Sequence, residues 1–273
     1  MPSWNIHIAH AEELFARNGA LAAAVHDRNA FLFGSVVPDI PVGYMVPGIA
    51  EPIPYTKTHF AKPEHIPKPR ESEFWDAYVV PVLKEDVEAA DALDVPVLTL
   101  AQERERLNRV HHPHRYRLAK PLPAGDPAPL AATSANVQQS VRDMVLGAWV
   151  HLLADNIWNT RVNEFLDSIG GKPSEEFRIK KQRDFDQFGK TLSIESIVRA
   201  SDRLVAAAQA FPQYAIRRDD TLYATGVIHE IVRTNPGSKK HAPYRLLNDE
   251  FFSATFTEVA DKAGLLFKLR MID

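Results

Sequence analysis

The fold of this chain is decided by the stretch GAWVHLLADNIW, residues 147–158. It is a nearly unbroken apolar helix pattern, so we expect other helices to surround it on all sides. His151 and Asp155 are four residues apart, which places both side chains on one face of that helix. A dry, unpaired carboxylate among such residues would cost several kcal/mol. We therefore expect a counter-charge for Asp155, and a bound metal cation is the simplest candidate.

Helical periodicity recurs on both sides of this stretch. The central helix itself is expected over 134–169, where Gly170-Gly171 and Pro173 end it. Further helices are expected over 5–25, 71–78, 82–92, 99–110, 175–188, 194–211, 221–232 and 245–268. Strand alternation is nearly absent. The sequence therefore predicts an all-α fold, with a single multi-helix domain over residues 1–273 built around the buried central helix.

Two proline-rich stretches interrupt the helical pattern. The first, at about 41–70, holds seven prolines, which forbid a continuous helix, and His59 lies inside it. The second runs over 111–129 and contains His111, His112 and His114 beside basic residues. We expect long loops here, and we interpret the three histidines as surface residues rather than metal ligands.

The composition of the chain limits the metal ligands, the partners and the location that we expect for it. Because the chain of 273 residues has no cysteine, any metal must be held by His, Asp and Glu. The net charge of −3 and the absence of a Lys/Arg block argue against double-stranded nucleic acid as the main partner. The N-terminus lacks a signal-peptide pattern, and no stretch approaches the roughly 20 apolar residues of a membrane span. We expect a cytoplasmic globular protein, and the sequence leaves its oligomeric state open.

Four short motifs, in chain order, hold the residues that could ligate a metal. They are PSWNIH (2–7), FLFGSVVPD (31–39), KTHF (57–60) and GAWVHLLAD (147–155). In this order and spacing they resemble the zinc-dependent phospholipase C family, bacterial enzymes related in fold to the fungal zinc nucleases that cut single strands. The chain would be a divergent member. The resemblance implies an all-α fold, zinc ions in a cleft, and hydrolysis of phosphoester bonds.

The ligand set that follows is a mixture of imidazoles and carboxylates, which suits zinc. It comprises His7, Asp39, His59, His151 and Asp155. We expect one or two zinc ions, because the family's second His-x-x-x-Asp/Glu pair has no counterpart after Asp155; iron or manganese would also suit these ligands. Asp39 and Asp155 are the expected catalytic residues, with Asp155 bridging metals and Asp39 orienting the attacking water.

Other residues could complete or line the centre. Candidates for an additional ligand or its support are His10, Asp184 (or Asp186, two residues on) and His229. Trp4 and Trp158 are candidates for the apolar wall of the substrate pocket.

These observations predict a metal-dependent hydrolase that acts on a small phosphoester substrate through a zinc-activated water. That substrate could be a lipid, a nucleotide or another metabolite. One alternative is a helical protein that keeps the family fold with one metal or none, and that binds a partner or catalyses other chemistry. A second alternative rests on His26-Asp27, which imitates the His-Asp metal pair of helical phosphohydrolases.

Overall fold

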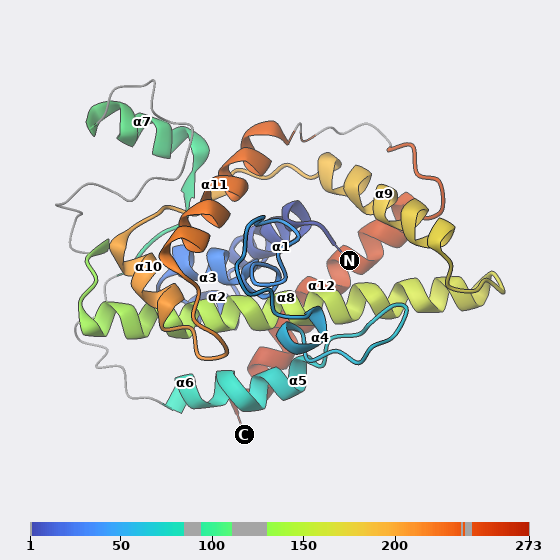
Figure 1. Cartoon of the computed structure of the whole chain (residues 1–273), viewed down its shortest axis with the longest axis horizontal. Coiled ribbons are helices and arrows are strands. Elements are labelled where there is room, and N and C mark those ends of the chain that lie inside the picture. Colours follow the sequence, from blue (N-terminus) through green and yellow to red (C-terminus); the bar gives the residue numbers. More distant parts are fainter. Residues whose placement is uncertain (1, 85–93, 111–129, 236, 238–241, 273) are drawn as a thin grey trace.

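Helix α8 (Ser134–Ser168) crosses the whole molecule, and the other helices pack around it (Figure 1). The computed structural model describes residues 2–84, 94–110, 130–235, 237 and 242–272. Thr133 caps the start of α8 by accepting a hydrogen bond from the backbone N–H of Asn136. Met144, Val145 and Leu146 follow one another at about 100° around the helix and are all 0% exposed, and every residue from Asp143 to Asp155 is buried. The middle of the central helix is therefore buried on all sides, as the apolar pattern predicts.

The remaining elements are also helical. They are α1 (Trp4–Arg17), α2 (Ala20–Ala24), α3 (Arg28–Gly34), α4 (Tyr55–Thr58), α5 (Glu71–Phe74), α6 (Val80–Lys84), α7 (Leu100–Val110), α9 (Glu175–Thr191), α10 (Asp202–Gln209), α11 (Arg218–Thr234) and α12 (Asp249–Arg270), with a 3-10 turn η1 (Val37–Asp39) and a π-helical segment η2 (Trp75–Val79). Within the described ranges, the strands are β1 (Leu98–Thr99) and β2 (Ser196–Ile197), which pair antiparallel. One continuous apolar core extends from Trp4 in α1 to Phe267 in α12. The predicted all-α, multi-helix domain is confirmed.

The contact between α3 and α8 depends on two glycines. A Cβ added to Gly147 would lie 2.1 Å from the carbonyl oxygen of Phe31, and one added to Gly34 would lie 2.1 Å from that of Met144. No side chain fits at either position, so the two backbones touch. This contact places Ser35 and the η1 turn, which follow α3, beside the middle of α8.

Three expected elements differ in the structure. The helix expected over 5–25 is two helices, because Asn18 adopts a left-handed conformation (φ 50°) and ends α1 before α2 begins at Ala20. The helix expected over 194–211 begins only at Asp202, where Ser201 caps α10, and strand β2 precedes it. The first proline-rich loop contains the short helix α4, which begins directly after Pro54.

The segments 71–78 and 82–92 are expected as two helices. Residues 71–84 instead form one helical run through α5, η2 and α6. Residues 85–92 and the second proline-rich stretch, with His111, His112 and His114, lie outside the described residues. None of the described helices is both long enough and apolar enough to cross a membrane.

Candidate metal centre

Five predicted ligand residues from four separate segments meet at the centre of the fold. They are His7 on α1, Asp39 at the end of η1, His59 directly after α4, and His151 and Asp155 on α8. All five are buried, and the most exposed, Asp39, is only 7% exposed. Helix α1 and the η1 turn pack on α8, and α4 packs on η1, so the cluster is part of the core of the protein.

The ligand atoms form two overlapping groups. In the first, Nε2 of His59 lies 3.1 Å from Nε2 of His151 and 3.5 Å from Oδ1 of Asp39. In the second, Nε2 of His7 lies 3.5 Å from Oδ1 of Asp155, and the His7 ring stacks on that of His151 at 3.9 Å. Within each group, the candidate ligand atoms lie within 4.8 Å of one another. Each group could therefore hold a metal ion.

In His151 and His59, the hydrogen bond made by Nδ1 decides which ring nitrogen carries the hydrogen and whether Nε2 is free to bind a metal. Nδ1 of His151 lies 2.8 Å from the carbonyl oxygen of Ser35, which can only accept, so Nδ1 carries the hydrogen. Nδ1 of His59 lies 2.7 Å from the Thr58 hydroxyl, which itself donates to the carbonyl of Tyr55. We assign the hydrogen of His59 to Nδ1 as well. In both neutral rings, Nε2 then presents a lone pair.

Several acceptor atoms of the centre consequently lack a donor. Two Nε2 lone pairs face each other at 3.1 Å, which is repulsive unless a cation lies between or beside them. Oδ1 of Asp39, Oδ1 of Asp155 and Nε2 of His7 are buried and have no hydrogen-bond partner among the described residues. Such atoms are costly to bury unless something satisfies them. Imidazole and carboxylate ligands of this kind fit zinc or a related divalent ion.

The ionisation of the cluster favours a cation. Burial alone would raise the pKa of Asp155, but His7, His151 and His59 outweigh it and hold that pKa below its ordinary value. Burial lowers the pKa of His7 and of His59. These shifts favour neutral His7 and His59 beside ionised carboxylates, which is the state that metal binding requires.

The Asp155 carboxylate is shared between the two groups. Its Oδ1 faces His7, whereas its Oδ2 lies 3.6 Å from Nε2 of His59 and 3.8 Å from that of His151. This is the arrangement of a bridging carboxylate. His151 has only one free lone pair, so one ion could use it. A second ion would have His7 and Asp155 as its protein ligands.

Two neighbours hold the carboxylates in place. Trp4 donates its indole N–H to Oδ2 of Asp39 at 3.0 Å, and Tyr55 donates its hydroxyl to Oδ2 of Asp155 at 3.1 Å. The Tyr55 ring also stacks on His59 at 3.8 Å. Our sequence analysis did not identify Tyr55, although its position four residues before His59, after Pro54, could have indicated a helical turn that brings the two together.

The two tryptophans do not line a substrate pocket as expected. Trp4 is 1% exposed and Trp158 is 0% exposed, so neither indole offers a surface to a ligand. Trp158 donates its N–H to Nε2 of His10 at 3.1 Å, and the His10 ring stacks on Phe256 at 4.3 Å. His10 thus lies one turn behind His7 with its Nε2 already occupied.

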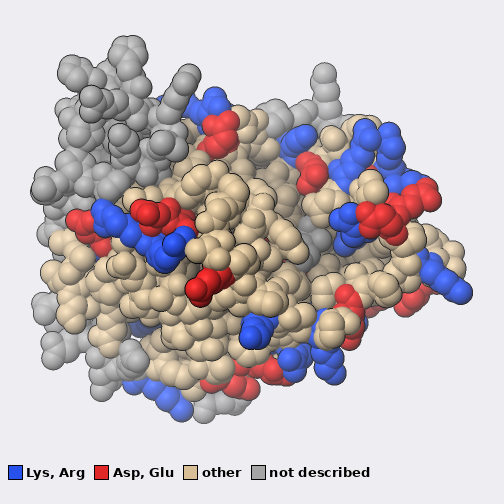
Figure 2. Space-filling model, viewed as in Figure 1, with Lys and Arg blue, Asp and Glu red and all other residues tan. Residues whose placement is uncertain are grey.

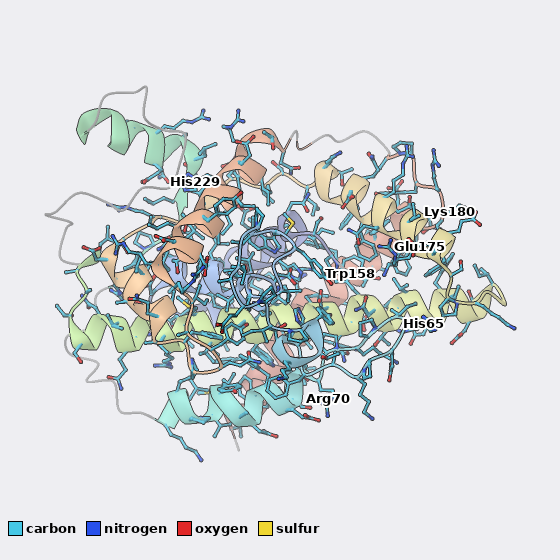
Figure 3. The ribbon with its side chains drawn as sticks, in the orientation of Figure 1. His65, Arg70, Trp158, Glu175, Lys180 and His229 are labelled. Atoms are coloured by element: carbon cyan, nitrogen blue, oxygen red, sulfur yellow. The ribbon has the colours of Figure 1, made fainter. Side chains whose placement is uncertain are left out.

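The structure does not bring Asp184 or His229 to the cluster. Asp184 accepts hydrogen bonds from three consecutive backbone amides, those of residues 245–247, at 2.7–2.9 Å. His229 on α11 donates from Nε2 to the carbonyl of Val198 at 2.8 Å and lies well away from Trp158 in Figure 3. Asp186 accepts from Gln182 on its own helix. These contacts support local structure.

The His26-Asp27 dipeptide also has a structural explanation. Asp27 caps α3 by accepting from the backbone N–H of Ala30, and its other oxygen pairs with Arg203 at 3.1 Å. His26 is half exposed and pairs with Asp94. Neither residue belongs to a candidate metal group among the described residues.

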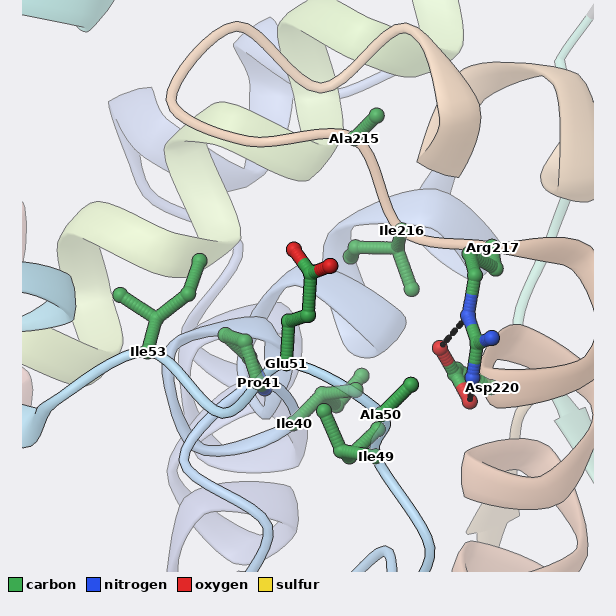
Figure 4. A pocket seen from close by; sticks show the side chains of 10 residues that line it. All are labelled: Ile40, Pro41, Ile49, Ala50, Glu51, Ile53, Ala215, Ile216, Arg217 and Asp220. Carbon is green, nitrogen blue, oxygen red and sulfur yellow. Dashed lines mark hydrogen bonds and ion pairs between the residues drawn. The ribbon is translucent and has the colours of Figure 1, made fainter.

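A pocket of about 400 Å³ is lined in part by Ile40 and Pro41, which directly follow Asp39 in the chain, although none of the five candidate ligands lines it. Ile40 and Pro41 form one wall, and Ile216 forms part of the opposite wall. Figure 4 shows the Glu51 carboxylate directed into this space. The lining is otherwise largely apolar.

The surface has no extended region of one charge on the face seen in Figure 2, where basic and acidic side chains are interspersed. The expectation that double-stranded nucleic acid is not the main partner remains a prediction.

Comparisons of the chain with protein-family models, with curated proteins and with solved structures found no match, so the phospholipase C resemblance depends on the four motifs alone.

Proposed function

We propose that this chain is a metal-dependent hydrolase of phosphoester bonds. The observation that carries the proposal is the pair of Nε2 lone pairs on His59 and His151, 3.1 Å apart, beside the ionised Asp39 and Asp155. A bound divalent ion, such as zinc, supplies a water of lowered pKa and stabilises negative charge on phosphoryl oxygens. The choice of phosphoester over other substrates comes from the motif resemblance.

Each residue of the cluster would have a separate role in binding the ion or in orienting the water. His59, His151, Asp39 and Asp155 would hold the ion, and His7 would extend the set through Oδ1 of Asp155. Asp39 would bind the ion through Oδ1, because Trp4 already occupies its Oδ2, and would orient the attacking water. Burial raises the pKa of Tyr55 well above its ordinary value, so its hydroxyl stays protonated and keeps Asp155 in position.

The test compares metal content and hydrolysis in matched variants. Wild-type protein, His151→Ala and His65→Ala are analysed for bound metal and assayed with bis(p-nitrophenyl) phosphate. His65 is exposed in the first proline-rich loop and serves as the control (Figure 3). We expect His151→Ala to lose the metal and at least about 100-fold in activity, and His65→Ala to retain both. Activity that survives complete chelation would contradict the proposal.

A structural metal centre is the second candidate. Catalytic sites keep one coordination position open, whereas structural sites are closed by protein ligands. Here all five candidate ligands are at most 7% exposed, which favours a closed site. Tightly bound metal in a protein that hydrolyses neither phosphodiesters nor phosphomonoesters would identify this alternative.

A further inference from the structure

The pocket behind the η1 turn contains a carboxylate that is available to a ligand. Glu51 is exposed, and its carboxylate is directed into the pocket (Figure 4). It makes no hydrogen bond or ion pair with another described residue. The basic residue of the described lining, Arg217, already donates from Nε and Nη2 to the Asp220 carboxylate at 2.8 and 3.0 Å. Glu51 therefore offers its negative charge to whatever enters the pocket.

The charges that line the pocket do not cancel. Glu51 and Asp220 are acidic and Arg217 is basic, so the described lining carries a net charge of −1. The hydrogen bonds to Asp220 raise the pKa of Arg217, and the Glu51 carboxylate acts in the same direction to a smaller degree, so the guanidinium stays charged. A ligand with one positive charge would neutralise the pocket, whereas an anion would be repelled.

The rest of the lining is aliphatic, which calls for an apolar body on the ligand. The volume of about 400 Å³ is in the range of small-molecule sites, about 300–1,000 Å³. The aliphatic lining comprises Ile40, Pro41, Ile49, Ala50, Ile53, Ala215 and Ile216. A ligand that matches this pocket combines a cationic group with a hydrocarbon portion.

The lining also distinguishes between kinds of organic cation. None of the ten described lining residues is aromatic. Quaternary ammonium groups carry no N–H and are recognised by aromatic cages, which the lining does not supply. A primary ammonium has three N–H donors, and the Glu51 carboxylate is a free acceptor for them. The pocket therefore suits a primary ammonium better than a quaternary one.

Both segments that line the pocket are held in place by hydrogen bonds. The backbone N–H of Ile53 donates to the carbonyl of Pro41 at 2.8 Å and closes the loop that carries Glu51. The side-chain amide of Gln213 donates to the carbonyl of Lys57 at 3.0 Å and ties down the segment that continues to residues 215–217. The pocket is thus formed before a ligand arrives, which reduces the entropic cost of binding.

We propose that this pocket binds a primary organic ammonium with an apolar body, through an ion pair with Glu51. The ammonium would donate hydrogen bonds to the Glu51 carboxylate, and the hydrocarbon portion would pack on the aliphatic lining. The inference goes beyond the proposed function, because no candidate metal ligand lines the pocket and binding there requires neither a metal nor a phosphoester.

The experiment titrates the full chain with phenethylammonium, followed by ligand-detected NMR. Glu51→Gln keeps the size of an exposed side chain and removes its charge, so the variant should fold. We expect its affinity for phenethylammonium to fall by about tenfold or more. Glu64→Gln, at an exposed position of the same proline-rich loop outside the pocket, should match wild type. Ala215→Phe, which fills space from an exposed lining position, should weaken binding independently of charge.

Two further probes test the chemistry of the ligand. Phenethyl alcohol has the same body without the charge, and trimethyl(phenethyl)ammonium has the charge without an N–H donor. Both should bind wild type about tenfold more weakly than phenethylammonium and should lose little affinity in Glu51→Gln.

The outcomes decide each part of the proposal. Phenethylammonium that does not bind wild type, or that binds Glu51→Gln or Ala215→Phe as well as wild type, would overturn the site. Equal affinity for the alcohol would overturn the ion pair, and equal or tighter binding of the quaternary probe would overturn the selection for a primary ammonium. A protein without bound metal would refute the proposed function and leave this site unaffected.

Discussion

The contact between α3 and α8 yields a sharp prediction, because it allows no side chain at Gly147. The Cβ of an alanine there would lie 2.1 Å from the carbonyl oxygen of Phe31 and 3.0 Å from Cα of Gly34. Contacts of Cβ atoms below 3.0 Å essentially do not occur, so the two backbones must separate by about 1 Å. A flexible side chain could rotate away, but a helix backbone cannot.

The expected cost of Gly147→Ala follows from two opposing effects. Overpacking costs up to about 3 kcal/mol, and we take the upper end because the obstacle is backbone. The gain in helix propensity from Gly to Ala returns about 1 kcal/mol. The net loss is about 2 kcal/mol, which in a chain of this size lowers Tm by about 4–8 °C. Zinc affinity should also fall, because Ser35, whose carbonyl fixes His151, directly follows α3.

Thermal denaturation of Gly147→Ala beside Gly264→Ala measures this effect. Gly264 lies within α12, and a Cβ there meets nothing within 4 Å. The control should therefore gain about 1 kcal/mol, or roughly 2–4 °C. If Gly147→Ala melts at or above wild type, as the control does, the two helices do not touch backbone to backbone and the placement of the η1 turn is wrong.

Three further predictions concern buried polar groups. Asp184→Asn should lose about 2–4 kcal/mol in urea denaturation at unchanged zinc content, because three amides bond to that carboxylate, whereas Asp186→Asn should stay near wild type. Burial raises the pKa of Asp143 to about 7, so its contribution to stability is complete below its unfolded pKa of 3.8 and is lost as the pH rises to about 7. The stability of Asp143→Asn relative to wild type should therefore rise between pH 5 and pH 8, and a pH-independent difference would refute this. Tyr55→Phe should weaken zinc binding by about tenfold, measured by competition with a chelator, because the hydroxyl bonded to Asp155 is removed; an unchanged affinity, like that expected for the exposed Tyr223→Phe, would show that the hydroxyl does not matter.

The central helix and its ligand pair could be predicted because their signals are local. The expected bounds, 134–169, differ by one residue from Ser134–Ser168, since Thr133 is a strong cap and the apolar pattern is continuous. The i, i+4 spacing places His151 and Asp155 on one face without any tertiary information. That His7, Asp39 and His59 join them was expected from the order of the four motifs.

The errors arose where distant contacts decide the structure. Strand β2 exists because it pairs with β1, about 100 residues earlier, so periodicity within 194–211 could not reveal it. Asp184 looked like a possible ligand, but the amides that it binds lie some 60 residues later. The break at Asn18 is a single left-handed residue inside a pattern that continues on both sides.

Metal analysis of the purified chain tests the central claim most directly. Wild-type protein, Asp155→Asn and His65→Ala are dialysed against zinc-free buffer and analysed for all divalent metals. We predict one to two equivalents of a divalent metal, zinc above all, in wild type and in His65→Ala, and a loss of most of it in Asp155→Asn. Wild-type protein with no bound metal, and with no affinity for zinc on titration, would contradict the account.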